Sequence, residues 1–249
     1  MSWGTLRTLE GDLAGARRAL EESRELFADL NEGNDQMQLL LRLADVRARE
    51  GDLEGALELC ERSRRQGAVG GEQAAISLAG AARLEARMDP GRLPALREEL
   101  TAALADLRGS DGPGRTHGRA MMLNALAALA LAGGDADGAS EHLVAGYAAA
   151  VESRDLPILA GVGVTVAAAL AHADRSRDAA EVLGSAARLR GAEDATSLDV
   201  ATLSAALREE LGDDGFAEAY ARGRGLAHDA AVAQLDPARL ALRTPAVRP

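Results

Sequence analysis

The residues of this chain that could do chemistry are few, and their spacing assembles no metal site. A zinc site needs three or four ligands, usually grouped in close pairs. The four histidines instead stand in separate segments, at His117, His142, His172 and His228. The single cysteine, Cys60, continues the apolar helical spacing of Leu53, Ala56 and Leu57, which favours a small core residue over a nucleophile. We therefore expect no cofactor, no metal ion and no catalytic thiol.

Two short motifs resemble ligand-binding loops, but each lacks an essential residue. The Asp-x-Asp-Gly of residues 135–138 matches the start of a calcium loop, yet Gly146 stands where the bidentate Glu is required. The Gly-x-Gly of residues 161–163 resembles a dinucleotide fingerprint, yet Val166 replaces the third glycine and no strand precedes it. Helix capping explains the first motif better, and close helix packing explains the second.

Three acidic pairs could in principle supply general acid and base groups: Glu21-Glu22, Glu98-Glu99 and Glu209-Glu210. Adjacent residues on a helix point about 100° apart, however, so the two carboxylates of a pair do not face one substrate. Each pair also has at least one arginine close by in the sequence, as solvated helix faces do. The chain is therefore not expected to be an enzyme.

The charge of the chain excludes other functions. Its 28 basic residues are all arginine and are outnumbered by 39 acidic ones, giving a net charge of −11 that repels nucleic acid. Without lysine there can be no phosphate-binding Gly-Lys-Ser/Thr loop. The absence of lysine is also typical of GC-rich coding sequences. No apolar run is long enough for a membrane span or begins like a signal peptide, so we expect a cytoplasmic location and no membrane contact.

The composition favours helices. Hydrophobic residues make up 47% of the 249 residues, but aromatic ones make up only 2%, and alanine and leucine supply most of the rest. Alanine and leucine favour helix, whereas the β-branched and aromatic residues that fill sheets are scarce. The expected fold class is all-α.

A repeat of about 40 residues organises these helices. Gly11-Asp12 recurs as Gly51-Asp52 and Gly134-Asp135, and degenerate copies occur at residues 88–91 and 173–176. Glycine can end a helix and aspartate can cap the next one, so each copy predicts a helix, a tight turn and a helix. The small residues that follow the turns are Ala16, Ala56, Ala95, Ala139 and Ala179, at spacings of 40, 39, 44 and 40. Helix pairs at this period predict a right-handed superhelical solenoid.

The predicted organisation has three parts. Residues 1–190 hold about five antiparallel helix pairs, at roughly 1–30, 35–66, 72–108, 116–153 and 155–190, the first with a short leading helix. The period is lost after residue 190, and helices at 198–211, 215–222 and 226–235 are expected to form a C-terminal cap over 191–235. Residues 109–114 are the clearest loop, and 236–249 are expected to be a flexible tail.

The repeats resemble tetratricopeptide repeats in the Trp3-Gly4 pair, the Gly11-Asp12 turn and Ala16, although the period exceeds the 34 residues of that family. Residues 180–190 resemble the Leu-Gly-Ala-Ala helix that closes such arrays in large bacterial transcriptional regulators. The terminal block is similar to that of antibiotic-regulatory activators with a bacterial transcriptional activator domain, and of large ATP-binding LuxR-type regulators. Its matching residues are Leu211-Gly212, Phe216, Tyr220, Gly223-Arg224, Leu226 and Ala230-Ala231-Val232.

The resemblance implies the sensor or interaction arm of an actinobacterial-type transcriptional regulator, joined to an ATPase and a DNA-binding domain that are not in this chain. The chain would couple a signal to those domains and would not bind nucleic acid directly. The alternative is a stand-alone tetratricopeptide-type scaffold protein.

The partner is expected on the first helix of each pair, which lines the concave surface of such solenoids. There the inward candidates are polar in the second pair and more apolar in the fourth: Gln38, Asp45, Arg49, Met121, Asn124, Ala128 and Leu131. We expect a protein or peptide segment, such as the regulator's own ATPase domain, or a small apolar ligand, with Asn124 as the polar anchor. The alternative is that the apolar positions are simply buried by packing.

Overall fold

The protein is all-helical in the part of the chain that the structure describes. A computed structural model describes residues 3–28, 33–66, 71–108, 116–194 and 196–242. Over these residues the backbone forms α-helices and one short 3₁₀-helix, and it contains no strand. The all-α expectation is confirmed, as the scarcity of β-branched and aromatic residues indicated. The loop expected at 109–114 and most of the expected tail, 243–249, lie outside the described residues.

The chain divides into two compact units. Unit 1 comprises Met1–Gly118 and Asp194–Leu198, and unit 2 comprises Arg119–Glu193 and Asp199–Pro249. The helices of unit 1 are α1 (Trp3–Glu10), α2 (Leu13–Ala28), α3 (Gly33–Arg49), α4 (Leu53–Gln66), α5 (Glu72–Met88), η1 (Pro90–Arg92) and α6 (Leu93–Arg108). Those of unit 2 are α7 (Thr116–Ala132), which begins in unit 1, α8 (Ala136–Ser153), α9 (Leu156–His172), α10 (Ser176–Arg190), α11 (Leu198–Arg224) and α12 (His228–Gln234).

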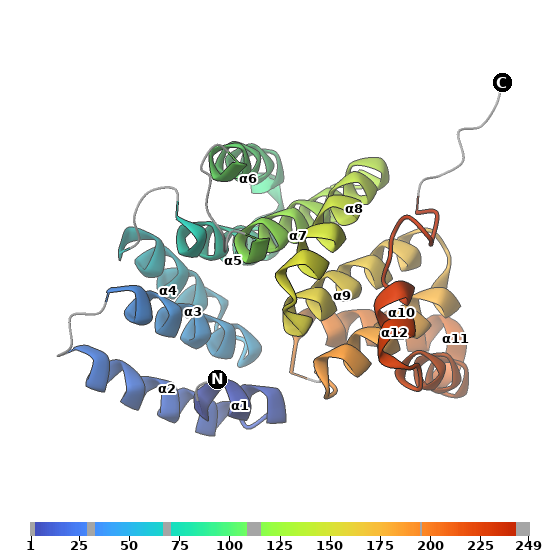
Figure 1. The fold of residues 1–249 in the computed structure, drawn as a ribbon, viewed down its shortest axis with the longest axis horizontal. Helices are drawn as coiled ribbons and strands as arrows, with labels where there is room; N and C mark the ends of the chain where they lie inside the picture. The colour runs from blue at the N-terminus through green and yellow to red at the C-terminus, as the bar shows by residue number, and fades with distance from the viewer. Residues whose placement is uncertain (1–2, 29–32, 67–70, 109–115, 195, 243–249) are drawn as a thin grey trace. The chain divides into compact units, whose positions relative to one another are not determined.

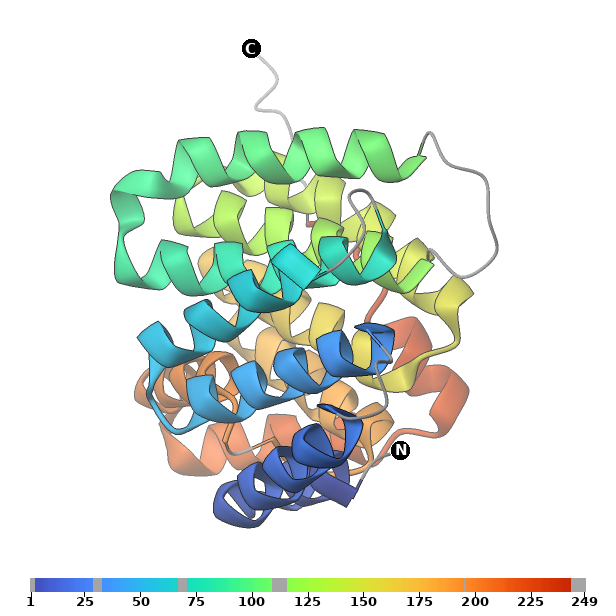
Figure 2. The same ribbon diagram turned by 90° about the vertical axis from the view of Figure 1, so that its left-hand side faces the viewer.

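Helix hairpins are the building blocks of both units. In unit 1, α1 packs on α2, α3 on α4 and α5 on α6, while α2 contacts α3 and α4 contacts α5 (Figures 1 and 2). In unit 2, α9 packs between α8 and α10, and α12 packs on α10. Each hairpin therefore buries the apolar stripe of one helix against its neighbour in the chain.

Three of the turns between paired helices have the same conformation. Gly11, Gly51 and Gly134 all have positive φ, at 81°, 88° and 75°, a region that favours glycine. In each turn the next residue is an aspartate whose N–H donates to the carbonyl five residues back, at 2.9–3.0 Å. The aspartate Oδ1 then accepts from the backbone N–H three residues ahead, at 2.9 Å, in the pairs Asp12–Gly15, Asp52–Gly55 and Asp135–Gly138. The Asp-x-Asp-Gly motif at 135–138 is thus part of a helix cap.

A fourth turn has the same backbone with different residues. Asp174 occupies the glycine position with φ of 57°, and the N–H of Arg175 donates to the carbonyl of Leu170 at 3.0 Å. Ala16, Ala56, Ala139 and Ala179, which follow the four turns, have no exposed surface. The absence of a larger side chain lets the paired helices approach closely at these positions.

The fifth turn differs, and the position expected for Ala95 is wrong. Between α5 and α6 the chain inserts the 3₁₀-helix η1, in which Asp89 Oδ1 accepts from the N–H of Gly91 at 3.0 Å. Ala95 is exposed, whereas the next residue, Leu96, is 1% exposed. Because proline at the start of η1 changes the path of the chain, the buried face of α6 begins one residue later than the repeat predicts.

Helices follow one another over the described residues after 193, as expected. The element α11 consists of two helical stretches on either side of Gly212, where φ is 72° and ψ is 163°, and the break lies between the helices expected at 198–211 and 215–222. The last helix, expected at 226–235, is α12. Beyond this break the ring of Phe216 stacks on that of Tyr220, with centroids 5.5 Å apart, and packs under the guanidinium of Arg208. Phe216 is buried, so these aromatic residues anchor the second half of α11.

Candidate interaction site

The residues expected to bind a partner lie on two helices, one in each unit. Gln38, Asp45 and Arg49 share one face of α3 in unit 1, since they are spaced by seven and four residues. Met121, Asn124, Ala128 and Leu131 share one face of α7 in unit 2 by the same reasoning. The structure thus brings together the members of each set, one set within unit 1 and the other within unit 2.

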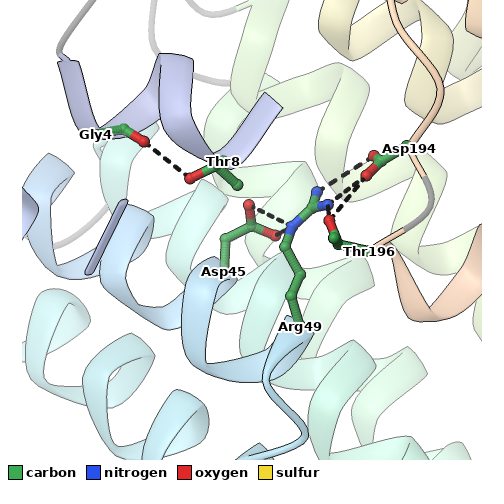
Figure 3. A network of polar contacts seen from close by, with 6 residues as sticks. All are labelled: Gly4, Thr8, Asp45, Arg49, Asp194 and Thr196. Carbon is green, nitrogen blue, oxygen red and sulfur yellow. Dashed lines mark hydrogen bonds and ion pairs between the residues drawn. The ribbon is translucent and has the colours of Figure 1, made fainter. Parts of the chain in front are cut away.

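On α3, Arg49 forms a network with residues from a distant part of the chain (Figure 3). Its Nε donates to both carboxylate oxygens of Asp45 at 2.9 Å. Its Nη1 donates to Thr196 Oγ1 at 2.8 Å, and Nη1 and Nη2 both contact the carboxylate of Asp194. We call Asp45, Arg49, Asp194 and Thr196 the Arg49 network.

The Arg49 network is largely shielded from water. The side chains of Arg49 and Asp194 are each only 10% exposed, whereas that of Asp45 is 53% exposed. Burial lowers the pKa of Arg49, but the charges and hydrogen bonds of Asp45 and Asp194 raise this pKa by more, leaving it above its ordinary value. Arg49 is therefore a permanent cation that two carboxylates of the same chain already neutralise.

The Arg49 network holds the segment Asp194–Leu198 to unit 1. Asp194 and Thr196 follow α10 in the sequence and lie 145 and 147 residues from Arg49. Sequence reasoning placed Arg49 on a partner-binding face and missed both residues. Apart from the opposite charges, no sequence signal links positions so far apart, because the contact depends on how the chain returns to unit 1.

The expected face of α7 is less buried at its start than at its end. Met121, Asn124 and Ala128 are partly exposed, whereas Leu131 is only 7% exposed and belongs to the core. The Oδ1 atom of Asn124 is itself buried and accepts no hydrogen bond from the described residues. A buried acceptor without a donor is unusual, since its desolvation costs about 1–3 kcal/mol.

Of the glycine and cysteine positions singled out in the sequence, Gly163 and Cys60 lie in close helix packing and Gly161 does not. A Cβ on Gly163 would lie 2.5 Å from Leu235 Cδ2, so this glycine allows close packing, while a Cβ on Gly161 would meet nothing within 4 Å. Cys60 is buried beside Ala44, Ala56 and Ala81. Burial, and then the charges of Asp45 and Glu61, raise the pKa of its thiol to about 11. The thiol of Cys60 is thus protonated at neutral pH.

The described residues contain neither a cluster of metal ligands nor a membrane-spanning helix. No three His, Cys, Asp or Glu side chains in this part of the chain gather closely enough to share a metal ion. None of the described helices combines the length and apolar character needed to cross a membrane.

Comparisons with known proteins add a structural resemblance only. No family model matches the chain, and no curated protein matches it either. Among solved structures, the chain is similar to the crystal structure of BtubC (BKLC) from P. vanneervenii. The two share 19% identity over 97% of this chain and 95% of that chain, with a TM-score of 0.48.

Proposed function

We propose that this chain is the interaction or ligand-sensing arm of an actinobacterial-type transcriptional regulator. In this proposal its hairpins form a right-handed, tetratricopeptide-like solenoid with a C-terminal cap. A protein segment, such as the regulator's own ATPase domain, binds the α7 face of unit 2 in the cytoplasm, and the α3 face of unit 1 is a separate candidate surface. The chain then couples a signal to ATPase and DNA-binding domains that lie elsewhere in the regulator.

Support for a repeat array comes from the four equivalent turns. The turns that begin α2, α4, α8 and α10 share a residue with positive φ and a hydrogen bond that spans five residues. The alanines that follow these four turns, Ala16, Ala56, Ala139 and Ala179, are fully buried. Repeated hairpins that bury only their neighbours are the elements from which helical solenoids are built.

The observation that carries the binding role is the unpaired Oδ1 of Asn124. This acceptor lies between the partly exposed Met121 and Ala128 on one face of α7. A partner on this face would gain apolar contact with Met121 and Ala128. Because Oδ1 is itself buried, the Asn124 amide must turn outward before this atom can accept a hydrogen bond from the partner, which would remove the cost of the unpaired acceptor. The adaptable thioether chain of Met121 suits such a surface.

The test is a calorimetric titration of the whole chain with the polypeptide encoded in frame upstream of it, produced separately. We expect saturable binding that weakens at least tenfold in Asn124→Leu. The same variant should be at least as stable as the parent in urea, because the substitution removes an unsatisfied buried acceptor. Loss of affinity without loss of stability separates a binding role from a structural one.

Gln38→Leu makes a similar polar-to-apolar change on the α3 face of the other unit and tests that candidate surface by itself. The proposed coupling is wrong if the parent does not bind at 100 µM, a concentration about tenfold above a dissociation constant of roughly 10 µM. If Asn124→Leu binds like the parent, the α7 face is not the binding surface.

A further inference from the structure

A groove in unit 1 lies apart from both expected faces. It opens between α5 and α6, at the end of this hairpin away from η1, and encloses about 390 Å³. Its floor is small and apolar: Gly71, Ala74, Ala75, Leu78, Ala103 and Leu107. Its rim carries Arg64 and Arg65 from the end of α4 and Asp106 from α6. We call this feature the α5–α6 groove.

The groove exists because the facing side chains are too small to meet. Gly71, Ala74, Ala75 and Leu78 lie on one face of α5, at the spacing of a helix stripe. Ala74 and Ala103 are partly exposed, unlike the fully buried alanines that follow the four equivalent turns. The apolar stripe of α5 is therefore covered towards η1 and left open near its first turns.

The residues that line the groove include two arginines and one aspartate, in a chain whose net charge is −11. Arg64 is exposed and pairs with no carboxylate of the described residues, while Arg65 contacts Glu61 only at 3.4 Å. Gly71, the N-cap of α5, supplies no side-chain cap, so the first N–H groups of this helix also favour an anion.

Besides Glu61, two further acidic residues lie near these arginines, Glu72 and Asp106. Glu72 Oε1 accepts from the backbone N–H of Gly118 at 3.0 Å and lies 3.7 Å from His117 Nδ1, so this carboxylate is engaged outside the groove. Asp106 is the single carboxylate on the rim. Because Arg65 contacts Glu61, Arg64 is the arginine of the rim that has no carboxylate partner among the described residues.

Two buried serines join α4 to α5 next to the groove. Ser63 Oγ lies 3.0 Å from Ser77 Oγ and donates to the carbonyl of Met37 at 3.2 Å. Both serines are fully buried, and each directly precedes a groove residue, Arg64 on α4 and Leu78 on α5. Hydrogen bonds between buried groups specify one arrangement of two helices, so the rim is held against the floor.

We propose that the α5–α6 groove binds a small amphipathic carboxylic acid, with its apolar tail on the alanine and leucine floor and its carboxylate on the guanidinium of Arg64, beside Arg65 on the same rim. Guanidinium groups pair with carboxylates through two parallel hydrogen bonds. The volume lies near the lower end of small-molecule sites, roughly 300–1,000 Å³. A partner helix would need large apolar pockets for its anchors, and a floor made mostly of alanine offers none.

The experiment uses the complete 249-residue chain and sodium decanoate as the probe, followed by isothermal titration calorimetry below the micelle concentration. We expect saturable binding at one site per chain. Arg64→Gln with Arg65→Gln should weaken binding at least tenfold. Arg62→Gln, an exposed arginine on the same helix that does not line the groove, should change the affinity less than twofold.

Two further measurements test the floor and the sign of the head group. Ala74→Leu should fill the groove and abolish decanoate binding while circular dichroism stays that of the parent. Decyltrimethylammonium, which has the same tail with a cationic head, should bind at least tenfold more weakly than decanoate. Neither the Ala74→Leu substitution nor the change of probe alters the α3 and α7 faces. The outcome for decanoate is therefore independent of the proposed function.

Three outcomes would overturn the assignment. The first is no saturable decanoate binding by the parent chain. The second is equal affinity in the Arg64 and Arg65 double variant, or equal affinity for the cationic probe, because charge would then play no part. The third is binding of an acidic amphipathic peptide, lost in Ala74→Leu, together with no decanoate binding, which would assign the groove to a protein partner.

Discussion

Gly184 of α10 and Gly223 of α11 face each other where these two helices cross. A Cβ on Gly184 would lie 2.1 Å from the carbonyl oxygen of Tyr220, and one on Gly223 would lie 1.8 Å from that of Glu181. Ser185 Oγ also donates to the carbonyl of Gly223 at 3.4 Å. The backbones of the two helices are thus in direct contact, which only glycine at both positions permits.

Adding a methyl group at either glycine should separate α10 from α11. We expect Gly184→Ala and Gly223→Ala each to lower the free energy of unfolding by about 3 kcal/mol, the upper end for overpacking, because rigid backbone stands in the way. Gly161→Ala is the control, since a Cβ there meets nothing within 4 Å. This change in the interior of α9 should instead stabilise by up to about 1 kcal/mol. Urea unfolding measures all three, and destabilisation by Gly161→Ala alone would refute the packing described.

Charges at the buried alanines should destabilise the hairpins. Ala56→Asp and Ala139→Asp should each lower the free energy of unfolding by about 3–5 kcal/mol, because each forces an unpaired charge into a close helix contact. Ala95→Asp is the matched control, since Ala95 is exposed on α6. Its effect should stay within about 0.5 kcal/mol. Thermal unfolding with equal loss in all three variants would reject the assignment of buried positions.

The turns could be predicted from the sequence because their determinants are local. Gly51 and Asp52 specify a positive φ and a helix cap within four residues, so the pattern alone places the ends of two helices. The same pattern misplaced Ala95, since the Pro90 insertion shifts the buried face of α6 by one residue.

The candidate site was less predictable because it depends on distant residues. Periodicity places Arg49 and Asn124 on their helix faces, but it cannot show that Asp194 contacts Arg49 or that no donor of the described residues reaches Asn124 Oδ1. The α5–α6 groove escaped notice for a similar reason. In the sequence, the alanines of the groove cannot be distinguished from the buried alanines that follow the four turns, because their exposure depends on the neighbouring helix.

Removing the cation of the Arg49 network should leave the buried carboxylate of Asp194 without the arginine that neutralises it. We expect Arg49→Met to lower the free energy of unfolding by about 3–5 kcal/mol, and Arg49→Met combined with Asp194→Leu to restore most of that loss. Arg47→Met is the control, because Arg47 and its partner Asp52 are 40% and 47% exposed. That substitution should cost less than about 1 kcal/mol. A coupling energy near zero between Arg49 and Asp194 would contradict the network.

The raised pKa of Cys60 predicts slow thiol chemistry and a defined pH dependence. With a folded-state pKa of about 11 against an ordinary 9.0, the thiolate fraction at pH 8 falls roughly a hundredfold. A disulfide reagent should therefore react with Cys60 only after unfolding. Since the folded state favours the neutral thiol, stability should be retained below pH 9 and lost as the pH rises towards 11. Cys60→Ala should lack this part of the alkaline loss, and rapid reaction of the folded parent would contradict the burial.

The most direct measurement of the proposed regulatory role is the DNA sequence in frame upstream of Met1. The account predicts that this reading frame continues into a phosphate-loop ATPase and a winged-helix DNA-binding segment. These are the domains to which the helical hairpins, with Asn124 on the α7 face, would couple a signal. A stop codon directly upstream, followed by a ribosome-binding site for this chain alone, would contradict that role and favour a stand-alone scaffold protein.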